Sequence, residues 1–339
     1  MRKKIIVFFE LTLSLAAFSF FVWKYLPPDM LFLEVILSNL AVKFVAGVSF
    51  IVFTAILIFL RKKFKTTAAL SLAFSGLLIF EVLSYHIPAG NQVELAGNKS
   101  FTLLSFNVKY DGLLSPELLD IVRHLDPGVI AFQEFAADHV RQFDSSLKQM
   151  GYSAAIDTAS PSVGAFAYAV YSKFPLRNHV LLNTKGPYWK TRWPFQGCEF
   201  LFTGQWIKIV NLHVIPPNNS IKGLFPYAPQ LKLIPAQLRT ASEYSDNGTQ
   251  PAIICGDLNQ TPSSKFLAVI RDCFIDSWEE SGSGFGFTWM NPKPMFKIDY
   301  IFHSPHLKSI SSGKVKNSFS DHHGLITRYI LINQSPDNR

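Results

Sequence analysis

Three polar side chains stand directly after apolar runs that are typical of buried strands. Glu134 follows residues 129–132, and Asp257 and Asn259 follow residues 252–255. Side chains two positions apart on a strand point the same way, so Asp257 and Asn259 share one side. A carboxylate at such a place is either a metal ligand or a group satisfied by backbone amides, and the Asp257 segment could also be a plain Asx turn.

A second set of residues is suited to acid–base chemistry. Asp299 lies inside an otherwise apolar strand segment, where an unpaired charge would be expensive, so it needs a histidine or an arginine as its partner. Asp321 and His322 follow later in the chain, and His213 ends another apolar run. A carboxylate beside an imidazole fixes its tautomer and raises its basicity, whereas isolated histidines would more simply be surface residues.

Together these groups are suited to hydrolysis of a phosphate ester. A hard divalent ion prefers carboxylate and amide oxygens, and no set of histidines and cysteines has zinc spacing. The three cysteines, Cys198, Cys255 and Cys273, are interpreted as small buried apolar residues. The sequence has neither the serine elbow of the α/β-hydrolases nor a Gly-x-x-x-x-Gly-Lys phosphate loop, which argues against an NTPase.

The elements that must position these groups alternate between strands and helices. Strands are predicted at residues 101–108, 128–132, 165–171, 206–213, 252–255, 298–302 and 324–332, and helices at 115–125, 137–150, 229–244 and 263–272. This alternation predicts an α/β layered fold with sheet at its centre. The polar residues follow the strand ends, which is where α/β scaffolds usually carry chemistry.

The order of these motifs resembles the endonuclease/exonuclease/phosphatase superfamily, which includes deoxyribonuclease I, and more narrowly a membrane-anchored bacterial-type member of it. The resemblance covers about residues 98–334. It rests on seven motifs in the family's order: Leu-Ser-Phe-Asn107, Phe-Gln-Glu134, Tyr-Ser-Lys-Phe-Pro at 171–175, Asn-Leu-His213, Gly-Asp257-Leu-Asn259, Ile-Asp299-Tyr-Ile-Phe and Ser-Asp321-His322-His323. It implies a four-layer α/β/β/α sandwich of two packed mixed β-sheets and a metal-dependent phosphodiester or phosphomonoester hydrolase.

The resemblance also implies roles for the metal and water ligands. Glu134 is expected to be the principal ligand of Mg²⁺ or Mn²⁺, assisted by Asn107 and by Asp321. Asp257 is expected to orient or deprotonate the attacking water, and Asn259 to hold a phosphate oxygen.

The remaining roles concern proton transfer and the substrate. His322, paired with Asp299, is expected to be either the general base or a stabiliser of the transition state. His213 would donate to a phosphate oxygen or to the leaving group. Arg192 could clamp a phosphate bidentately, or it could be an ordinary solvated loop arginine.

The N-terminal quarter is predicted to be a membrane anchor. Residues 5–23, 44–60 and 66–87 are three largely apolar runs, each long enough or nearly long enough to span the hydrocarbon layer as a helix. Basic clusters precede the first run and separate the second from the third, which places both in the cytoplasm by the positive-inside rule. A multi-pass protein of the cell (inner) membrane, with its catalytic part on the extracytoplasmic side, is therefore expected. A further apolar segment, residues 32–40, would invert this topology if it crossed the membrane.

The predicted organisation follows from these segments. Residues 1–88 form the membrane region with about three transmembrane helices, 89–98 a linker, 99–334 the catalytic domain and 335–339 a tail. An aromatic-rich stretch around Trp189, Trp193, Phe195 and Trp206 is either a lipid-contacting hairpin or ordinary core packing.

The charge distribution bears on the expected partners. The net charge is +8, but residues 1–88 hold nine Lys and Arg against four Asp and Glu, so the rest of the chain carries only +3. We therefore expect a phosphoester such as a lipid headgroup or a small molecule as the substrate, with the lipid bilayer as a partner. Extracytoplasmic DNA or RNA is the less favoured alternative, and the sequence leaves the oligomeric state open.

Overall fold

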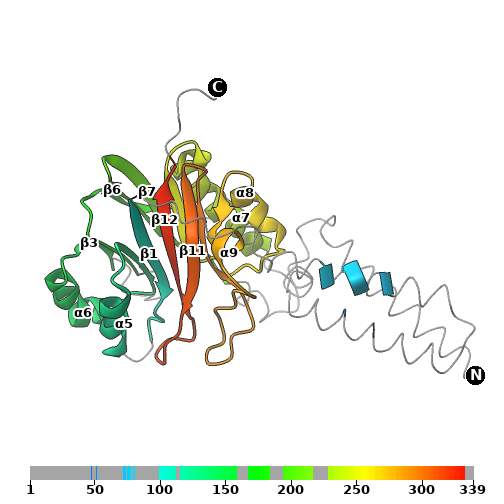
Figure 1. Ribbon diagram of the computed structural model, residues 1–339, viewed down its shortest axis with the longest axis horizontal. Helices are drawn as coiled ribbons and strands as arrows, with labels where there is room; N and C mark the ends of the chain where they lie inside the picture. Colours follow the sequence, from blue (N-terminus) through cyan, green and yellow to red (C-terminus); the bar gives the residue numbers. More distant parts are fainter. Residues whose placement is uncertain are drawn as a thin grey trace, which may run out of the picture.

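The computed structural model describes residues 99–111, 115–158, 167–183, 194–216 and 228–332, together with isolated positions between 47 and 80. Two six-stranded sheets form the centre of this part of the chain (Figure 1). Helices α5 and α6 lie on one side of the strands, and α7 and α8 on the other (Figure 1).

The first sheet has the strand order β11-β12-β1-β2-β4-β3. Its strands are β1 (Ser100–Asn107), β2 (Val129–Gln133), β3 (Ser153–Asp157), β4 (Tyr168–Ser172), β11 (Leu307–Val315) and β12 (Gly324–Leu331). Strands β1 and β2 are parallel, whereas β12 pairs antiparallel with β1. The sheet is therefore mixed, and its last strand in sequence lies beside its first.

The second sheet has the order β5-β6-β7-β8-β10-β9. Its strands are β5 (Leu176–Leu182), β6 (Phe195–Phe202), β7 (Gln205–His213), β8 (Ala252–Asp257), β9 (Ile275–Asp276) and β10 (Asp299–His303). Strands β7 and β8 are parallel, and β10 is antiparallel to β8 with Asp299 opposite Asp257.

The helices are α5 (Glu117–Leu125), α6 (Ala137–Gln149), α7 (Ala228–Tyr244), α8 (Ala268–Arg271) and α9 (Ser277–Ser281), with the 3₁₀ turns η4 (Asp246–Gly248) and η5 (Lys265–Leu267). All of these helices except α9 cover the outer face of a sheet, whereas Trp278 of α9 packs into the layer between the two sheets. Helix α5 has a strong apolar stripe, with Leu118 and Val122 buried, and this stripe is what attaches it to the sheet.

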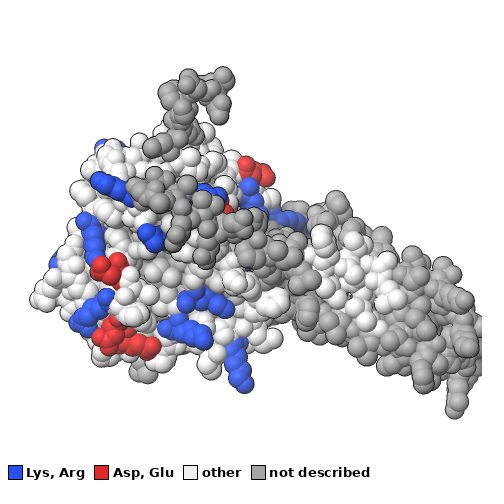
Figure 2. All heavy atoms as spheres, in the orientation of Figure 1, with Lys and Arg blue, Asp and Glu red and all other residues white. Residues whose placement is uncertain are grey.

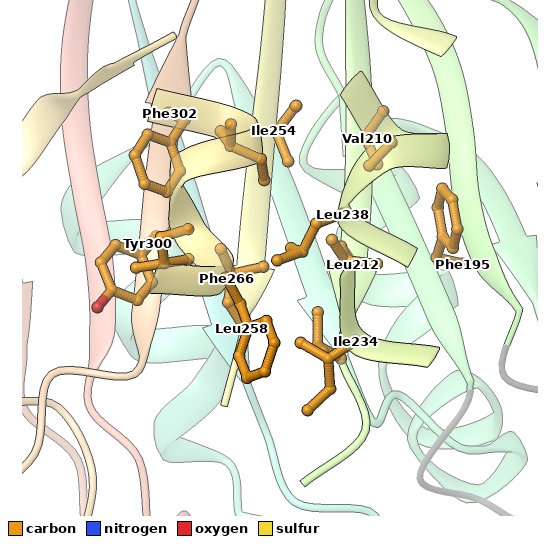
Figure 3. Close-up of a cluster of buried hydrophobic side chains, with 14 of the residues drawn as sticks. Phe195, Val210, Leu212, Ile234, Leu238, Ile254, Leu258, Phe266, Tyr300 and Phe302 are labelled. Atoms are coloured by element: carbon orange, nitrogen blue, oxygen red, sulfur yellow. The ribbon is translucent and has the colours of Figure 1, made fainter. Parts of the chain in front are cut away.

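Three apolar layers hold the sandwich together. Between the two sheets, the cluster includes Leu103 and Val129 from the first and Ile209 from the second. Successive strand residues point to opposite faces, so Leu104 packs outward against α5 and α6 instead. The third layer lies between the second sheet and α7 and α8, and Figure 3 shows part of it, with Leu238 among the strand side chains.

The structure confirms the prediction of two packed mixed sheets with helices. The seven predicted strands and three of the four predicted helices are present within a few residues of their expected bounds, and residues 263–272 form the short elements η5 and α8 instead of one helix. Strands β3, β5, β6, β9 and β11 were not predicted. Phe195 is fully buried in the layer beneath α7, so core packing is the correct interpretation of this residue; Trp189 and Trp193 lie outside the described residues.

The predicted membrane anchor falls almost wholly outside the described residues. Within the part of the chain that is described, no helix has the length and apolar character needed to cross a membrane. The membrane anchor and its topology therefore remain predictions.

Candidate active site

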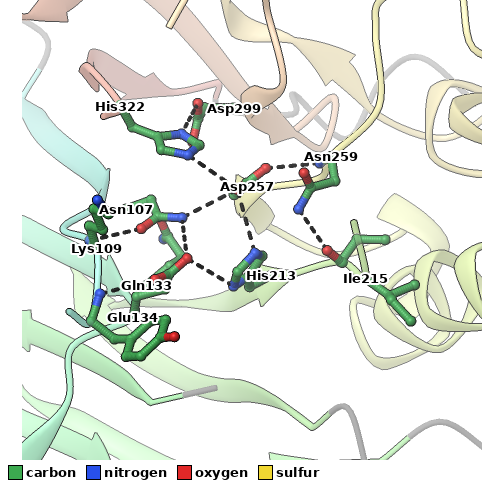
Figure 4. Close-up of polar contacts among 12 residues, drawn as sticks. Asn107, Lys109, Gln133, Glu134, His213, Ile215, Asp257, Asn259, Asp299 and His322 are labelled. Carbon is green, nitrogen blue, oxygen red and sulfur yellow. Dashed lines mark hydrogen bonds and ion pairs between the residues drawn. The ribbon is translucent and has the colours of Figure 1, made fainter. Parts of the chain in front are cut away.

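Most of the predicted site residues converge at one end of the sandwich, across the junction of the two sheets (Figure 4). From the first sheet come Asn107, at the end of β1, and Glu134, directly after β2. From the second sheet come His213 and Asp257, which lie side by side at the ends of the parallel strands β7 and β8. Asp299 begins β10 opposite Asp257, so the sheet register alone places three of these groups together.

Glu134 is held in a fixed orientation by donors on the neighbouring loop. Its Oε1 accepts a hydrogen bond from the side chain of Asn107 (3.0 Å), and its Oε2 accepts one from the backbone amide of Tyr110 (3.0 Å). Nδ1 of His213 lies 3.7 Å from Oε1. The Glu134 backbone has φ 58°, a left-handed conformation that is costly for a residue with a side chain and that clusters at functional sites.

Asn107 links the carboxylates of the two sheets. Its Nδ2 donates to Glu134 Oε1 at 3.0 Å and to Asp257 Oδ2 at 3.2 Å, while its Oδ1 accepts from the backbone amide of Lys109 at 3.0 Å. Nε2 of His213 lies 3.5 Å from the same Asp257 oxygen. Two buried or nearly buried carboxylates thus face each other across the Asn107 amide and the His213 ring.

His322 forms the predicted pair with Asp299. The Nδ1 of His322 is 2.9 Å from Asp299 Oδ2, and its Nε2 is 3.7 Å from Asp257 Oδ2. Burial alone would lower the pKa of His322, but the charges of Asp299 and Asp257, with the hydrogen bond to Asp299, outweigh it and raise the pKa to about 10. The imidazole is therefore positively charged at neutral pH.

The pKa of Asp257 is also raised, but for a carboxyl group this favours the neutral form. Burial raises the pKa of its carboxyl to about 6, a rise that Asp299 reinforces and that His322 and His213 partly offset. Its Oδ1 accepts from the backbone amide of Asn259 at 2.9 Å. A carboxylate with this pKa can accept a proton near neutral pH, which an ordinary aspartate does poorly.

Asn259 lies at the rim of the site with φ 50°. Its Nδ2 donates to the carbonyl of Val214 at 2.9 Å, which uses one of the two hydrogens on that nitrogen. The expected contact with a phosphate oxygen would therefore use the second hydrogen.

Two groupings of residues could hold a cation. One is Asp257, Asp299 and His322, whose ligand atoms all lie within 4.8 Å of one another. In that group, however, Nδ1 of His322 is already hydrogen-bonded to Asp299, and the positive imidazole repels a cation.

The better grouping is the one around Glu134. Its carboxylate and the oxygen of Asn107, once the amide is turned over, supply oxygen ligands of the kind that a hard cation prefers, with the Asp257 carboxylate facing them. A cation there would take the place of the Asn107 amide nitrogen that now bonds to both carboxylates, so the donor set fits the group.

Two predicted site residues are not brought to this centre by any described contact. Arg192 lies outside the described residues. Among the described hydrogen bonds and ion pairs, none joins the side chain of Asp321 to Glu134 or Asn107; its carbonyl accepts from the backbone of Asn291. The charge of Asp321 contributes to the raised pKa of His322, so its proximity is to the histidine.

Several residues that serve the site were not predicted. Lys109 has φ 61°, and the turn it makes directs its own amide to Asn107 and the next amide, from Tyr110, to Glu134. Ser320 accepts from the amide of His322 (3.1 Å) and donates to the carbonyl of Asn107 (2.7 Å). The serine of the Ser-Asp-His motif was a signal for Ser320; the Lys109 turn had no signal in the sequence.

Comparison with known proteins agrees with this fold. Residues 104–322 match the Endonuclease/Exonuclease/phosphatase family, which is more than half of the chain. The protein therefore belongs to the endonuclease/exonuclease/phosphatase family, a family of phosphoester hydrolases, and the predicted superfamily is confirmed. A comparison with curated proteins gave no match.

Solved structures with this fold come from several organisms. An endonuclease/exonuclease/phosphatase from Beutenbergia cavernae is 18% identical, with a TM-score of 0.55, over 69% of this chain and 72% of that chain. The human Nocturnin catalytic domain with a bound sulfate anion is 18% identical, with a TM-score of 0.53, over 69% and 95%. The 3′ phosphatase NExo from Neisseria, bound to a product DNA hairpin, is 13% identical, with a TM-score of 0.53, over 67% and 98%. At these identities the likeness shows the fold alone.

Proposed function

We propose that the protein is a membrane-anchored, Mg²⁺- or Mn²⁺-dependent phosphoesterase that hydrolyses a phosphodiester or phosphomonoester outside the cytoplasmic membrane. The observation that carries the chemistry is the meeting of Glu134 and Asp257, from different sheets, on the same amide nitrogen of Asn107. Two carboxylates facing each other in this way suit a divalent cation and a water that attacks phosphorus.

The proton transfers follow from the two perturbed groups. Asp257 takes the proton of the attacking water, because burial raises its pKa to about 6. His322, kept positive by Asp299, stabilises the charge that develops on the phosphate oxygens in the transition state. His213, which lies between the two carboxylates, donates to a phosphate oxygen or to the leaving group. This division assigns the base to Asp257 and the stabilising cation to His322.

The metal would be held by Glu134 with the oxygen of Asn107. When bound, it polarises the phosphoryl oxygen and neutralises part of the charge of the transition state. Before the metal binds, the hydrogen bond from the Tyr110 amide keeps the Glu134 side chain oriented toward the centre of the site. The side chain therefore has to move less when the metal binds.

The location is proposed from the apolar runs and basic clusters of residues 1–88. Fusing a reporter after residue 90 tests it: a reporter that is active only outside the cytoplasm should work, and strong activity of a cytoplasm-only reporter would contradict the proposal.

A lipid headgroup or a small phosphoester is the substrate class we favour. The chain from residue 89 onward has a net charge of only +3. On the face seen in Figure 2, the basic side chains of the described residues lie at several separate places, some of them with acidic neighbours. These residues therefore form no continuous basic stripe there for a nucleic-acid backbone. Extracytoplasmic DNA or RNA is kept as the second candidate because the similar fold of NExo was solved with a DNA hairpin.

The decisive experiment is a panel of phosphoesters with purified full-length protein in detergent. Nucleic acid, phospholipids and generic diesters are each tested with Mg²⁺, Mn²⁺ or no metal, and plasmid nicking reports the nuclease alternative. Glu134→Gln should abolish any genuine activity, whereas Glu243→Gln, at an exposed position of α7, should not. Hydrolysis of no phosphoester by folded protein, or equal activity of Glu134→Gln, would refute the proposal.

A further inference from the structure

A line of buried amide side chains crosses the interior next to the active site. Gln133 closes β2 of the first sheet, and Asn211 lies on β7 of the second; both are fully buried. The Nε2 of Gln133 donates to the Oδ1 of Asn211 at 2.7 Å. Asn211 in turn donates to Gln196 Oε1 at 3.3 Å. These polar groups occupy the layer that elsewhere joins the two sheets through aliphatic and aromatic side chains.

Asn211 also bonds to the backbone of the opposite sheet. Its Nδ2 donates to the carbonyl of Phe132 at 2.9 Å, one residue before Gln133. Contacts between aliphatic side chains are not directional. They therefore determine the position of one sheet relative to the other only through the complementary shapes of the packed side chains. Hydrogen bonds from one sheet to the side chain and the backbone of the other do define that register.

The hydrogen-bonded bridge between Gln133 and Asn211 lies next to the catalytic residues in both sheets. Gln133 immediately precedes Glu134, and Asn211 lies two residues before His213, on the same side of its strand. The site itself spans the same junction, because His213 of the second sheet lies 3.7 Å from Glu134 of the first. A displacement of one sheet by an ångström would separate these groups, and errors of that size cost about 10²-fold in rate.

Stability alone does not account for the bridge. Each buried hydrogen bond contributes only about 0.5–1.5 kcal/mol net, and apolar residues of similar volume often replace buried polar groups without loss. Gln133 Oε1 has no hydrogen-bond partner among the described residues, so the arrangement is not even optimal for stability.

We propose that Gln133 and Asn211 are positioning residues, whose side-chain bridge sets the distance between Glu134 and the His213–Asp257 side of the site and thereby tunes metal binding and turnover. This inference rests on the proposed phosphoesterase function, but the bridge predicts a metal-affinity effect that is measurable without any substrate.

The test compares Asn211→Leu and Gln133→Met, which keep the side-chain volume and remove the bridge, with Tyr152→Phe as a matched control. The Tyr152 hydroxyl donates to the carbonyl of Pro127 at 2.6 Å, and it is a buried hydrogen bond at the far end of the first sheet. Each full-length variant is titrated with Mn²⁺ while its melting temperature is followed, and kcat is measured on the best substrate of the panel, well below that temperature.

Removal of the bridge should raise the Mn²⁺ concentration that gives half of the full rise in melting temperature, and it should lower kcat. Each change should be about tenfold or more, because small misplacements of catalytic groups are costly. Tyr152→Phe should change only the melting temperature. The double variant Gln133→Met/Asn211→Leu should lose less than the sum of the two single variants, since each single variant already removes the contact between the two residues.

Equal Mn²⁺ titrations for Asn211→Leu, Gln133→Met and the control would overturn the inference, and so would additive losses in the double variant. If Asn211→Leu does not fold, Gln133→Met decides, because Asn211 then keeps its bonds to Phe132 and Gln196. If no substrate is found, the Mn²⁺ titration still decides, so failure of the proposed function and failure of this inference are distinguishable.

Discussion

Removal of the charge on Asp299 is the sharpest test of how the active site works. In Asp299→Asn the amide oxygen can still accept a hydrogen bond from Nδ1 of His322, so the ring keeps its place. The charge that holds the pKa of His322 at about 10 is lost, however. An opposite charge at this range is worth about 1 to 3 pKa units, so the pKa of His322 should fall to between about 7 and 9.

The consequence is a shift of the alkaline limb of the pH–rate profile. His322 stays protonated, the form that stabilises the transition state, until the pH rises through its raised pKa. Wild-type activity should therefore persist to about pH 10, whereas Asp299→Asn should lose activity about 1 to 3 pH units earlier. For a variant pKa near 8, the rate at pH 9 falls about tenfold relative to its own plateau.

The assay is kcat against pH, from about pH 5 to well above the pKa of about 10, on the best substrate of the panel, with Asp272→Asn, at an exposed position, as the control. A uniform loss at every pH with the alkaline limb unmoved would refute the reasoning, since Asp299 would then orient the ring without setting its charge. Movement of the limb to higher pH would refute the assignment of His322 as the positive group.

Three further predictions concern metal binding at Glu134, the contribution of Glu280 to stability, and the lack of space for a side chain at Gly256. Mn²⁺ should raise the melting temperature of the wild type but not of Glu134→Gln, because a ligand stabilises only the state that binds it; equal shifts would place the metal elsewhere. Although burial opposes it, hydrogen bonds from His303 and Ser309 lower the pKa of Glu280 to about 2, so this carboxylate stabilises the fold above about pH 4.5 and loses that effect as the pH falls toward 2. Glu280→Gln should thus lower the free energy of unfolding by about 1–3 kcal/mol at pH 7 and by progressively less in acid, and a constant difference in urea titrations would contradict this. Gly256→Ala should cost about 3 kcal/mol or more, because the added Cβ would lie 1.9 Å from the carbonyl oxygen of Leu212 at a backbone with φ 132°; a near-normal urea midpoint would show that the strands yield.

Part of the site could be predicted because burying an unpaired charge is energetically costly. Asp299 stands in an apolar strand, so it had to have a partner, and the structure provides His322 at 2.9 Å. The strands that carry Asn107, Glu134 and Asp257 have near-continuous apolar runs, and these were predicted because both of their faces are covered.

Four of the five strands that escaped prediction, β3, β5, β9 and β11, lie at the edges of the two sheets. Strand β5 is largely exposed, so it has no apolar alternation to detect. Strand β11 contains several serines, one of which, Ser309, is buried and hydrogen-bonded to Glu280. Such polar partners depend on tertiary contacts, which no local period in the sequence records.

The parts of the site that could not be predicted depend on contacts between the sheets. The bridge between Gln133 and Asn211 joins residues 78 positions apart, and nothing in their spacing indicates it. The left-handed backbone conformation of Lys109 could not be predicted either, because lysine is not a residue that usually marks such turns.

The place of β12 beside β1 has a consequence for how this protein becomes active during synthesis. Strand β1 is made early, yet its antiparallel partner is the last strand of the domain to leave the ribosome. His322, directly before that strand, arrives with it, while Asn107 and Glu134 have long been translated. A nascent chain therefore carries its acidic groups without the histidine and without a closed first sheet. The complete set of site residues, and the strand that pairs with β1, are therefore present only once β12 has been translated.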